Sequence, residues 1–280
     1  MALTTLRDIC KNHCHGANAI GAFNIHNLEF IKGVIKGAEE LNQPVIMMIN
    51  EGVLMYGEIE VLGKACVEAA KRAKVDVAVM VDHGHNVEFL KKALDNEIDV
   101  MYDGSAEPFE DNVAVTKMLR EYAFARGRSL EGEIGALGLS EDGDEENEAK
   151  MTTPHEAKVF ADATGVDILA VSVGNVHGFY QGEAKIDVDR VKAISEIVGN
   201  LPVVMHGGSD IPYPTIKQSI LNGIKKFNIA TDLKFAYSKK MRELVGGEHM
   251  EIQPLKLFPV VADAVAEVVK EKIKMFNLEV

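Results

Sequence analysis

Short apolar runs alternate with longer amphipathic segments along the whole chain. Eight of the runs are almost wholly apolar, which is typical of parallel strands that are buried on both faces. They span residues 19–23, 44–49, 75–81, 98–102, 130–134, 168–173, 203–205 and 226–229. The pattern therefore predicts eight strands of a parallel sheet.

The segments between these runs repeat apolar residues every three or four positions, as one face of a helix does. In the segment 28–41 this face carries Ile31, Val34, Ile35 and Ala38. Similar segments span 61–73, 87–93, 112–125, 154–163, 188–197, 213–221 and 233–244, and a last one covers about 258–276. We expect each of them to form a helix.

Strands that alternate with helices predict an α/β fold, and eight such units favour a (β/α)8 TIM barrel. We expect a single domain over residues 1–280 with an extra C-terminal helix, because no Pro/Gly/Ser-rich linker divides the chain. A doubly wound open sheet is the alternative. It is less favoured because eight strands in one domain close naturally, and no G-x-G-x-x-G motif follows the first strand.

Composition narrows the possible functions. The formal charge of −13 argues against nucleic-acid binding, and no apolar run approaches the roughly 18 residues of a membrane span. The N-terminus lacks the apolar stretch of a signal peptide. The cysteines, Cys10, Cys14 and Cys66, are too sparse for a disulfide framework, so we expect a cytoplasmic protein. The sequence favours Cys10 and Cys14 as ordinary helix residues. A small metal site that they form with His13 and His15 is the alternative.

Polar residues suited to chemistry lie at or just after the ends of the predicted strands. In a (β/α)8 barrel these ends meet at one mouth, where the active site lies. The residues are Asn24, Asp82, His83, Asp103, Glu133, His177, His206, Asn228, Thr231 and Asp232. We therefore expect them to gather in one site.

Three of these residues predict a metal site. His83, His177 and His206 each come shortly after an apolar run and directly before a glycine. A lone histidine is more often structural, but three at the ends of three strands favour a shared ion. Imidazole suits Zn²⁺, and three protein ligands leave a position open for substrate.

The ends of the last two strands predict an anion site. The motif HGGS (206–209) follows the seventh strand, and a helix begins near Thr231 after the eighth. Backbone N–H groups in such places bind phosphate, often after strands seven and eight of a barrel. A tight turn is the alternative explanation for HGGS. The acidic segment 139–149, which follows the fifth strand, is either a solvated loop or a mobile lid over the site.

Several motifs, in this order and spacing, resemble the class II ketose-bisphosphate aldolases, a family that includes fructose- and tagatose-bisphosphate aldolases. The similarity runs from about residue 3 to residue 244 and weakly into the last helix. The matching stretches are GAFNIHNLEFI, PVIMMINEG, VDHGHNVEFLKKAL, VMYDGSAEPFEDNVAVTK, LEGEIGALGLSEDG, TGVDILAVSVGNVHGFY, PVVMHGGSDIP and GIKKFNIATDLK.

The resemblance implies a retro-aldol lyase that cleaves a ketose 1-phosphate or 1,6-bisphosphate to dihydroxyacetone phosphate and an aldehyde. It implies that the three histidines bind the catalytic metal, usually Zn²⁺. By the same resemblance Asp82 acts on the substrate hydroxyl proton, and Glu141, in a mobile loop, moves the proton at the enediolate carbon. Asp103 and Glu133 match residues that can hold a second metal position.

The donor half of the substrate also has a matching site by resemblance. Its residues are Asn24, Gly178, Gly207, Ser209, Asn228 and Thr231. Backbone carbonyls near Val176 and Ser209 resemble a site for a monovalent cation, Na⁺ or K⁺. Relatives are homodimers or homotetramers, so we expect an oligomer.

The chain departs from the family pattern in four places. Leu139 follows Gly138 where a second glycine is usual, Asp210 replaces a glycine, and Asn50-Glu51 stands where many relatives have a hydroxyl residue. The fourth departure lies before the last helix, where relatives often carry an arginine that binds the distal phosphate. Here the sequence of this segment is EIQPLK (251–256), and no arginine follows Arg242. The usual C-terminal Gly-Ser-Ala run is also replaced by NLEV.

The missing arginine leads to a hypothesis. The acceptor aldehyde is unphosphorylated or differently charged, unless Lys256 takes the place of the arginine. Lysine offers phosphate a point charge in place of a bidentate fork. Two further alternatives are another metal-dependent barrel enzyme, such as an isomerase, epimerase or hydrolase, and a non-catalytic relative.

Overall fold

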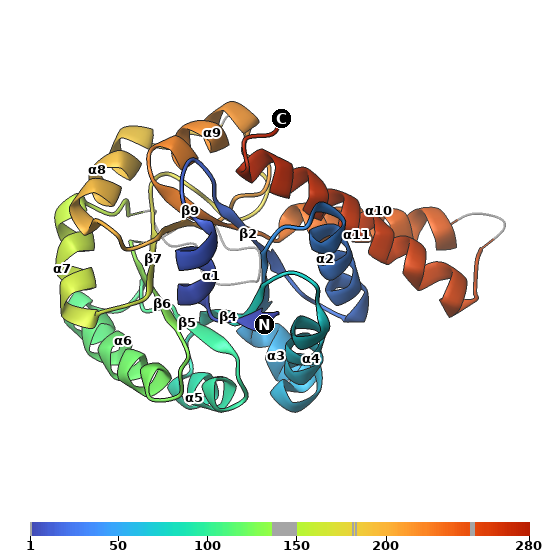
Figure 1. The fold of residues 1–280 in the computed structure, drawn as a ribbon, viewed down its shortest axis with the longest axis horizontal. Coiled ribbons are helices and arrows are strands. Elements are labelled where there is room, and N and C mark those ends of the chain that lie inside the picture. Colours follow the sequence, from blue (N-terminus) through green and yellow to red (C-terminus); the bar gives the residue numbers. More distant parts are fainter. Residues whose placement is uncertain (1, 136–149, 181, 183, 247–249) are drawn as a thin grey trace.

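A closed barrel of eight parallel strands forms the centre of the protein (Figure 1). The computed structural model describes residues 2–135, 150–180, 182, 184–246 and 250–280. The barrel strands are β2 (Ile20–Asn24), β3 (Val45–Asn50), β4 (Val77–Gly84), β5 (Asp99–Tyr102), β6 (Leu130–Ile134), β7 (Ile168–Val171), β8 (Val203–Met205) and β9 (Ile224–Ile229). The ring closes because β2 pairs with both β3 and β9, with Ile20 opposite Lys226. The (β/α)8 prediction is confirmed, and the open sheet is excluded.

Helices surround the barrel, as the amphipathic segments predicted. They are α1 (Leu6–His13), α2 (Leu28–Leu41), α3 (Glu51–Gly57), α4 (Lys64–Arg72), α5 (Val87–Asp95), α6 (Phe109–Phe124), α7 (Pro154–Thr164), α8 (Val188–Val198), α9 (Tyr213–Leu221), α10 (Thr231–Val245) and α11 (Pro254–Phe276). The extra C-terminal helix is α11, so this part of the prediction is also confirmed.

The predicted helix 61–73 was wrong at its start. The chain is already helical from Glu51, where the Asn50 side chain caps α3 by accepting a hydrogen bond from the Gly52 N–H (2.9 Å). A π-helical segment, η1 (Glu58–Gly63), then joins α3 to α4. Glu58, where this segment begins, has a left-handed φ of 57°, and a π-helical segment does not follow the 3.6-residue period on which the prediction depended.

Helix α1 covers the N-terminal end of the barrel. Its Leu6, Ile9 and Cys10 are buried and pack against side chains that point into the barrel, among them Ile46. The Leu6 N–H donates a hydrogen bond to Asp99 Oδ2 (2.6 Å) and ties the helix to β5. Figure 1 shows α1 in the middle of the ring of strands. The mouth that carries the polar strand ends lies opposite.

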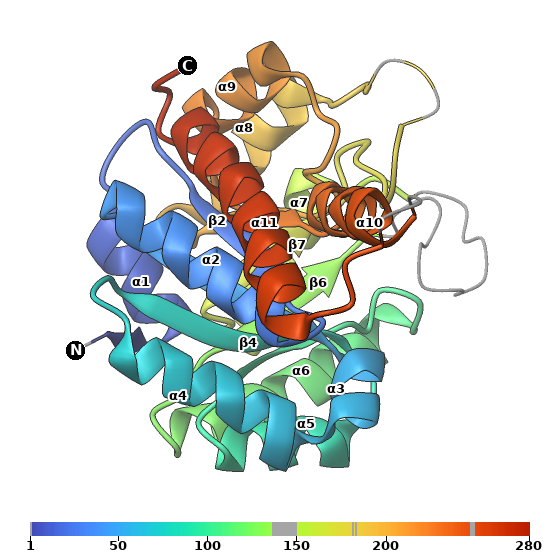
Figure 2. The same cartoon turned by 90° about the vertical axis from the view of Figure 1, so that its right-hand side faces the viewer.

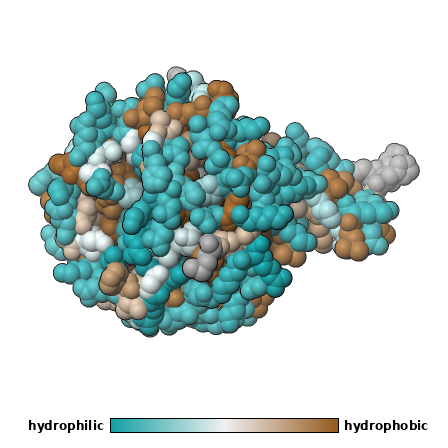
Figure 3. All heavy atoms as spheres, in the orientation of Figure 1, coloured by the Kyte–Doolittle hydropathy of each residue, from teal (hydrophilic) through white to brown (hydrophobic). Residues whose placement is uncertain are grey.

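Helix α11 packs on α2 with unusually close backbones (Figure 2). A Cβ atom at Gly33 would lie 2.7 Å from the Ala262 carbonyl oxygen, so only glycine permits this approach. Together α10 and α11 extend beyond the barrel (Figure 1). The face drawn in Figure 3 is mainly hydrophilic with scattered apolar residues, and the described residues include no helix that is long and apolar enough to cross a membrane.

Candidate active site

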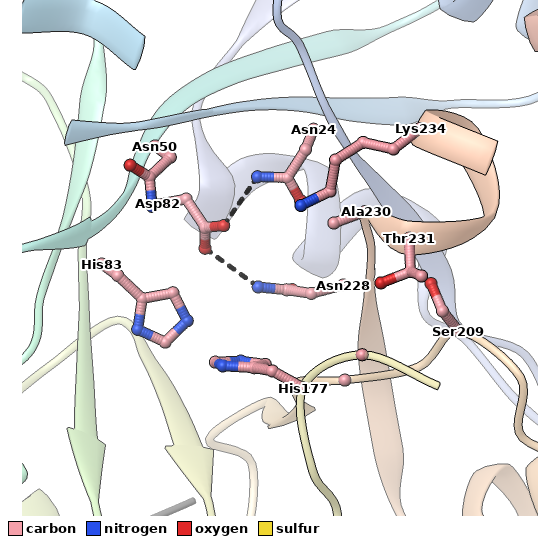
Figure 4. A pocket seen from close by; sticks show the side chains of 12 residues that line it. Asn24, Asn50, Asp82, His83, His177, Ser209, Asn228, Ala230, Thr231 and Lys234 are labelled. Atoms are coloured by element: carbon pink, nitrogen blue, oxygen red, sulfur yellow. Dashed lines mark hydrogen bonds between the residues drawn. The ribbon is translucent and has the colours of Figure 1, made fainter. Parts of the chain in front are cut away.

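One cavity at the C-terminal mouth of the barrel collects most of the residues predicted from the sequence (Figure 4). The strand ends converge there because all eight barrel strands run parallel. The lining residues are Asn24, Asn50, Asp82, His83, His177, Gly178, Gly207, Ser209, Asn228, Ala230, Thr231 and Lys234. The expectation that the polar strand ends gather in one place therefore holds for Asn24, Asp82, His83, His177, Asn228 and Thr231.

The three predicted histidines lie together. Ring centroids are 4.9 Å apart for His83 and His177, 4.6 Å for His83 and His206, and 6.2 Å for His177 and His206. One nitrogen from each ring lies within 4.8 Å of the other two, so the three side chains could hold one ion. His83 reaches this position through a left-handed backbone (φ 48°), a conformation that few residues other than glycine adopt.

Hydrogen bonds leave one nitrogen of two of these rings available to a metal. His83 Nδ1 lies 2.7 Å from Asp103 Oδ2, and His206 Nε2 lies 3.0 Å from Glu131 Oε1. A carboxylate on one nitrogen of a metal-binding imidazole is the usual outer partner, because it fixes the ring and its tautomer. His206 Nδ1 is buried and has no hydrogen-bond partner among the described residues. The three imidazole nitrogens, including this Nδ1 atom of His206, fit a divalent metal such as Zn²⁺.

The protonation of the histidines differs with their surroundings. Burial lowers the pKa of His83, but Asp82 and the hydrogen bond with Asp103 raise it more, to about 10. Burial, together with the neighbouring histidines, lowers the pKa of His177 to about 3. A metal that binds here at neutral pH would therefore displace a proton from His83.

A second group of ligand atoms lies beside the first. His83, Asp103 and Glu133 also have ligand atoms within 4.8 Å of one another. Glu133 Oε2 lies 3.6 Å from both His83 Nδ1 and His206 Nδ1, and it has no hydrogen-bond partner within the described chain. Burial, and then the charge of Asp103, raises the pKa of Glu133 well above its usual range. The geometry is that expected of an alternative metal position.

Asp82 is held at the cavity wall by two amides. Asn24 Nδ2 donates to Asp82 Oδ2 (2.9 Å), and Asn228 Nδ2 donates to Asp82 Oδ1 (3.0 Å). Burial raises the pKa of Asp82, but His83, His206 and Lys226 together lower it below its usual value. The carboxylate is thus ionised at neutral pH and able to accept a proton.

The opposite wall is suited to an anion. Gly207 has φ 61°, and a Cβ atom there would lie 1.9 Å from the Val176 carbonyl oxygen, so this turn requires glycine. Helix α10 begins at Thr231 beside the cavity, and its cap residue Ala230 makes no side-chain hydrogen bond, while the Asp232 N–H donates to Ser209 Oγ (3.4 Å). Lys234 extends from the same helix into the cavity (Figure 4) and adds a positive charge.

Two departures from the family pattern have structural explanations. Asp210 adopts a left-handed backbone (φ 60°), and its Oδ2 accepts a hydrogen bond from the Tyr180 N–H (3.3 Å). Glu51 is buried, and its Oε2 accepts from the backbone N–H of His85 (2.6 Å). Both carboxylates therefore bind neighbouring loops, while Asn50 lines the cavity.

Four predicted residues, His206, Asp103, Glu133 and Asp232, are not among those that line the cavity in the described part of the chain. Lys256 is not among the lining residues of the described chain; its side chain is 72% exposed, with Nζ 3.9 Å from Glu251 Oε2. Glu141 and the acidic segment 139–149 lie outside the described residues. The Cys10–Cys14 clip also finds no support, since neither cysteine belongs to a potential metal group in the described part of the chain.

Sequence reasoning missed Glu131, Lys226 and Lys234. Glu131 and Lys226 are fully buried inside the barrel, next to His206 and Asn228 respectively. Each lies two positions before a predicted site residue on its strand, Glu133 or Asn228. Because side chains two apart share a face of a strand, this spacing was the available indication.

Comparisons with known proteins agree with this geometry. The family model described as fructose-bisphosphate aldolase class-II matches residues 4–279. The chain is 37% identical to the fructose-bisphosphate aldolase of Thermus caldophilus, covering 99% of this chain and 98% of that protein. It is 35% identical to the sulfofructosephosphate aldolase of Alkalicoccus urumqiensis, covering 100% and 98%. The solved structure of the YdjI aldolase from Escherichia coli K12 superposes with a TM-score of 0.86 at 32% identity, covering 98% and 97%.

Proposed function

Because the chain belongs to the class II fructose-bisphosphate aldolase family, it is a lyase that acts on a phosphorylated sugar, and we propose how its residues do so. The substrate is a ketose 1-phosphate or ketose 1,6-bisphosphate. Cleavage between C3 and C4 yields dihydroxyacetone phosphate and an aldehyde, and the reaction is reversible.

The metal site is His83, His177 and His206, with Zn²⁺ as the proposed ion. The observation that carries this proposal is the buried Nδ1 of His206, which has no hydrogen-bond partner among the described residues and lies beside the other two rings. A divalent cation held there supplies a Lewis acid that stabilises the negative charge left on the donor half when the carbon–carbon bond breaks. Asp103 and Glu133, with His83, are proposed as its alternative position.

Asp82 is the proposed acid and base. Its carboxylate takes the proton from the C4 hydroxyl, the C3–C4 electrons pass to the donor half as an enediolate, and C4 becomes the aldehyde carbonyl. The two amides on Asp82 keep the carboxylate oriented toward the cavity. Glu141 is proposed to return a proton to the enediolate carbon, which completes dihydroxyacetone phosphate. Such positioned proton transfers typically contribute about 10²- to 10⁴-fold to a rate.

The donor phosphate is proposed to bind between the ends of β8 and β9. Backbone groups at Gly178, Gly207 and Ser209, with Asn228 and Thr231, form this wall. Phosphate at the start of α10 benefits from the positive end of the helix dipole. Lys234 adds a point charge. Carbonyls of Val176 and Ser209 are proposed to bind a monovalent cation, Na⁺ or K⁺, near this wall.

The distal group of the substrate is the part in which we propose a difference from fructose bisphosphate. No arginine follows Arg242, and Lys256 does not line the cavity of the described chain. One relative is named a sulfofructosephosphate aldolase, which supports variation of the distal group within the family. As the alternative to a 1,6-bisphosphate, we therefore propose a ketose 1-phosphate whose acceptor aldehyde is not glyceraldehyde 3-phosphate. As in the family, we expect a homodimer or homotetramer.

A panel of ketose phosphates tests the proposal, with release of dihydroxyacetone phosphate as the readout, with and without a chelator. Release that stops with chelator and returns with Zn²⁺ supports the metal-dependent aldolase. No release from any member would favour an isomerase, epimerase, hydrolase or non-catalytic protein. A kcat/KM for a bisphosphate more than about 100-fold above that for the 1-phosphates would reject the altered acceptor.

A further inference from the structure

A single buried ammonium connects the two halves of the site. Lys226 is 0% exposed and lies inside the barrel on β9. Its Nζ lies 2.9 Å from Glu131 Oε2 and 3.1 Å from Glu131 Oε1, and it donates to Asn228 Oδ1 (2.8 Å). From these two partners, hydrogen bonds continue to His206 and to Asp82.

The first branch fixes the direction of an amide. An ammonium can only donate hydrogen bonds, so the oxygen of Asn228 must face Lys226. The amide NH2 then faces the other way, where it donates to Asp82 Oδ1. Without the ammonium, Asp82 alone would orient the amide, and the Asn228 oxygen would lose the donor that holds its other end.

The second branch fixes a tautomer. Glu131 is buried as a carboxylate beside the ammonium, and a carboxylate can only accept. His206 Nε2, 3.0 Å from Glu131 Oε1, must therefore carry the hydrogen. The lone pair is then on Nδ1, the buried atom that faces the other two histidines.

We propose that Lys226 is a positioning residue that sets both the metal-binding tautomer of His206, through Glu131, and the amide that holds Asp82, through Asn228. Proton acceptor and metal ligands are thus aligned by one group that contacts neither substrate nor metal. The inference rests on the metal site proposed above.

Burial explains why a lysine stands here despite its cost. A buried ion pair is a weak source of stability, because desolvation offsets most of the attraction between its charges. The reason for a cation is the direction of its hydrogen bonds. An ammonium can only donate, so Glu131 and Asn228 must both direct an oxygen atom toward it. A role in stability alone predicts that a neutral side chain of equal length would leave His206 and Asp82 unchanged.

The test compares Lys226→Met, Asn228→Leu and Glu131→Gln with Lys225→Met. Lys225 precedes Lys226 on β9, but its Nζ donates to the Gly16 carbonyl outside the barrel, so it serves as the matched control. We expect Lys226→Met to weaken Zn²⁺ binding about 10- to 100-fold, as loss of outer partners does, and to lower kcat. Asn228→Leu should lower kcat and leave Zn²⁺ affinity within about threefold, whereas Glu131→Gln should weaken Zn²⁺ binding.

The double variant Lys226→Met/Glu131→Gln removes both charges and guards against a folding defect. Its glutamine can present either end of the amide to His206, so Zn²⁺ affinity should stay reduced although folding is restored. Wild-type Zn²⁺ affinity in this double variant or in Lys226→Met would overturn the proposal.

The wild-type protein without metal provides a second measurement. Nitrogen-15 NMR of the labelled histidines should show His206 with hydrogen on Nε2 and none on Nδ1. Hydrogen on Nδ1 would overturn the inference whether or not the variants fold. A wild-type protein with this tautomer that binds no Zn²⁺ would instead contradict the proposed metal function, so the two failures can be told apart.

Discussion

Asn24, at the end of β2, donates a hydrogen bond from Nδ2 to Oδ2 of Asp82, 2.9 Å away on β4. With Asn228 on the other oxygen, the carboxylate has a fixed plane and a depressed pKa. We predict that Asp82→Ala lowers kcat about 10²- to 10⁴-fold, the usual contribution of a positioned base. Zn²⁺ content should stay near wild type, since Asp82 is not a proposed ligand. Wild-type kcat in a metal-loaded variant would remove Asp82 from the mechanism.

The metal can be tested by removal and return. A chelator should abolish release of dihydroxyacetone phosphate, and Zn²⁺ should restore it, because the developing charge then has no other cation of equal strength. His206→Ala should bind Zn²⁺ much more weakly, whereas His15→Ala, on a residue outside the cavity, should not. Full activity after exhaustive chelation would contradict a metal-dependent reaction.

The position of Lys234 in the cavity predicts that its loss weakens substrate binding more than it slows the chemical step. Loss of one charge-assisted contact costs about 1.5–3 kcal/mol, so Lys234→Met should raise KM about tenfold or more, with a smaller change in kcat. Lys240→Met on the same helix is the control, because its Nζ pairs with Glu243 on the surface (2.5 Å). Equal KM values in the two variants would show that Lys234 does not bind the substrate.

Gly207 and Gly165 form a matched pair. Both have left-handed backbones (φ 61° and 66°), but a Cβ atom at Gly207 meets the Val176 carbonyl at 1.9 Å, whereas nothing lies within 4 Å at Gly165. Alanine at Gly165 should cost only backbone strain, of order 1 kcal/mol. Alanine at Gly207 should also displace the loop that carries His177, and so reduce Zn²⁺ affinity. Similar Zn²⁺ affinities in both variants would show that the loop tolerates the contact.

The raised pKa of the buried Asp99 carboxyl predicts that the stability of the fold depends on pH. Burial raises its pKa to about 7, against the opposing effects of Arg128 and the N–H groups of Leu6 and Ser129. In the unfolded chain this carboxyl titrates near 3.9, so the folded chain binds more protons between about pH 4 and pH 7. The free energy of unfolding should therefore fall as pH rises through this window.

Urea unfolding of wild type and Asp99→Asn across the window checks this sign. The variant cannot titrate at position 99, so its advantage or deficit relative to wild type should shift in its favour from about pH 4 to about pH 7, and then level off. A difference that is constant across the window would mean that Asp99 keeps an ordinary pKa.

The sequence was sufficient for the architecture and for most of the cavity. Apolar runs located all eight barrel strands, and the position of His83, His177 and His206 after three of them brought the rings together. Both results follow from local sequence patterns, because the C-terminal ends of parallel barrel strands lie at the same mouth and residues there come close together.

What the sequence could not supply depends on distant contacts. Glu131 and Lys226 interact only because β6 and β9 face each other inside the barrel, 95 residues apart in the chain. The Asp210 carboxylate accepts a hydrogen bond from the Tyr180 N–H, 30 residues away in the chain, and the sequence pattern gives no indication of this contact. The π-helical segment η1 could not be predicted because its residues do not follow the 3.6-residue apolar period of an α-helix.

The bond between Asn228 and Asp82 joins residues 146 positions apart, and it exists only because β9 returns to pair with β2. During synthesis, a chain that has emerged just past β8 already carries all three histidines and Asp82. It lacks the strand that supplies Lys226, Asn228 and the start of α10. Contacts of such long sequence separation form late and slowly. We therefore expect a chain that ends before β9 to be inactive toward sugar phosphates, because the contact from Asn228 to Asp82 forms only when the last strand pairs with the first.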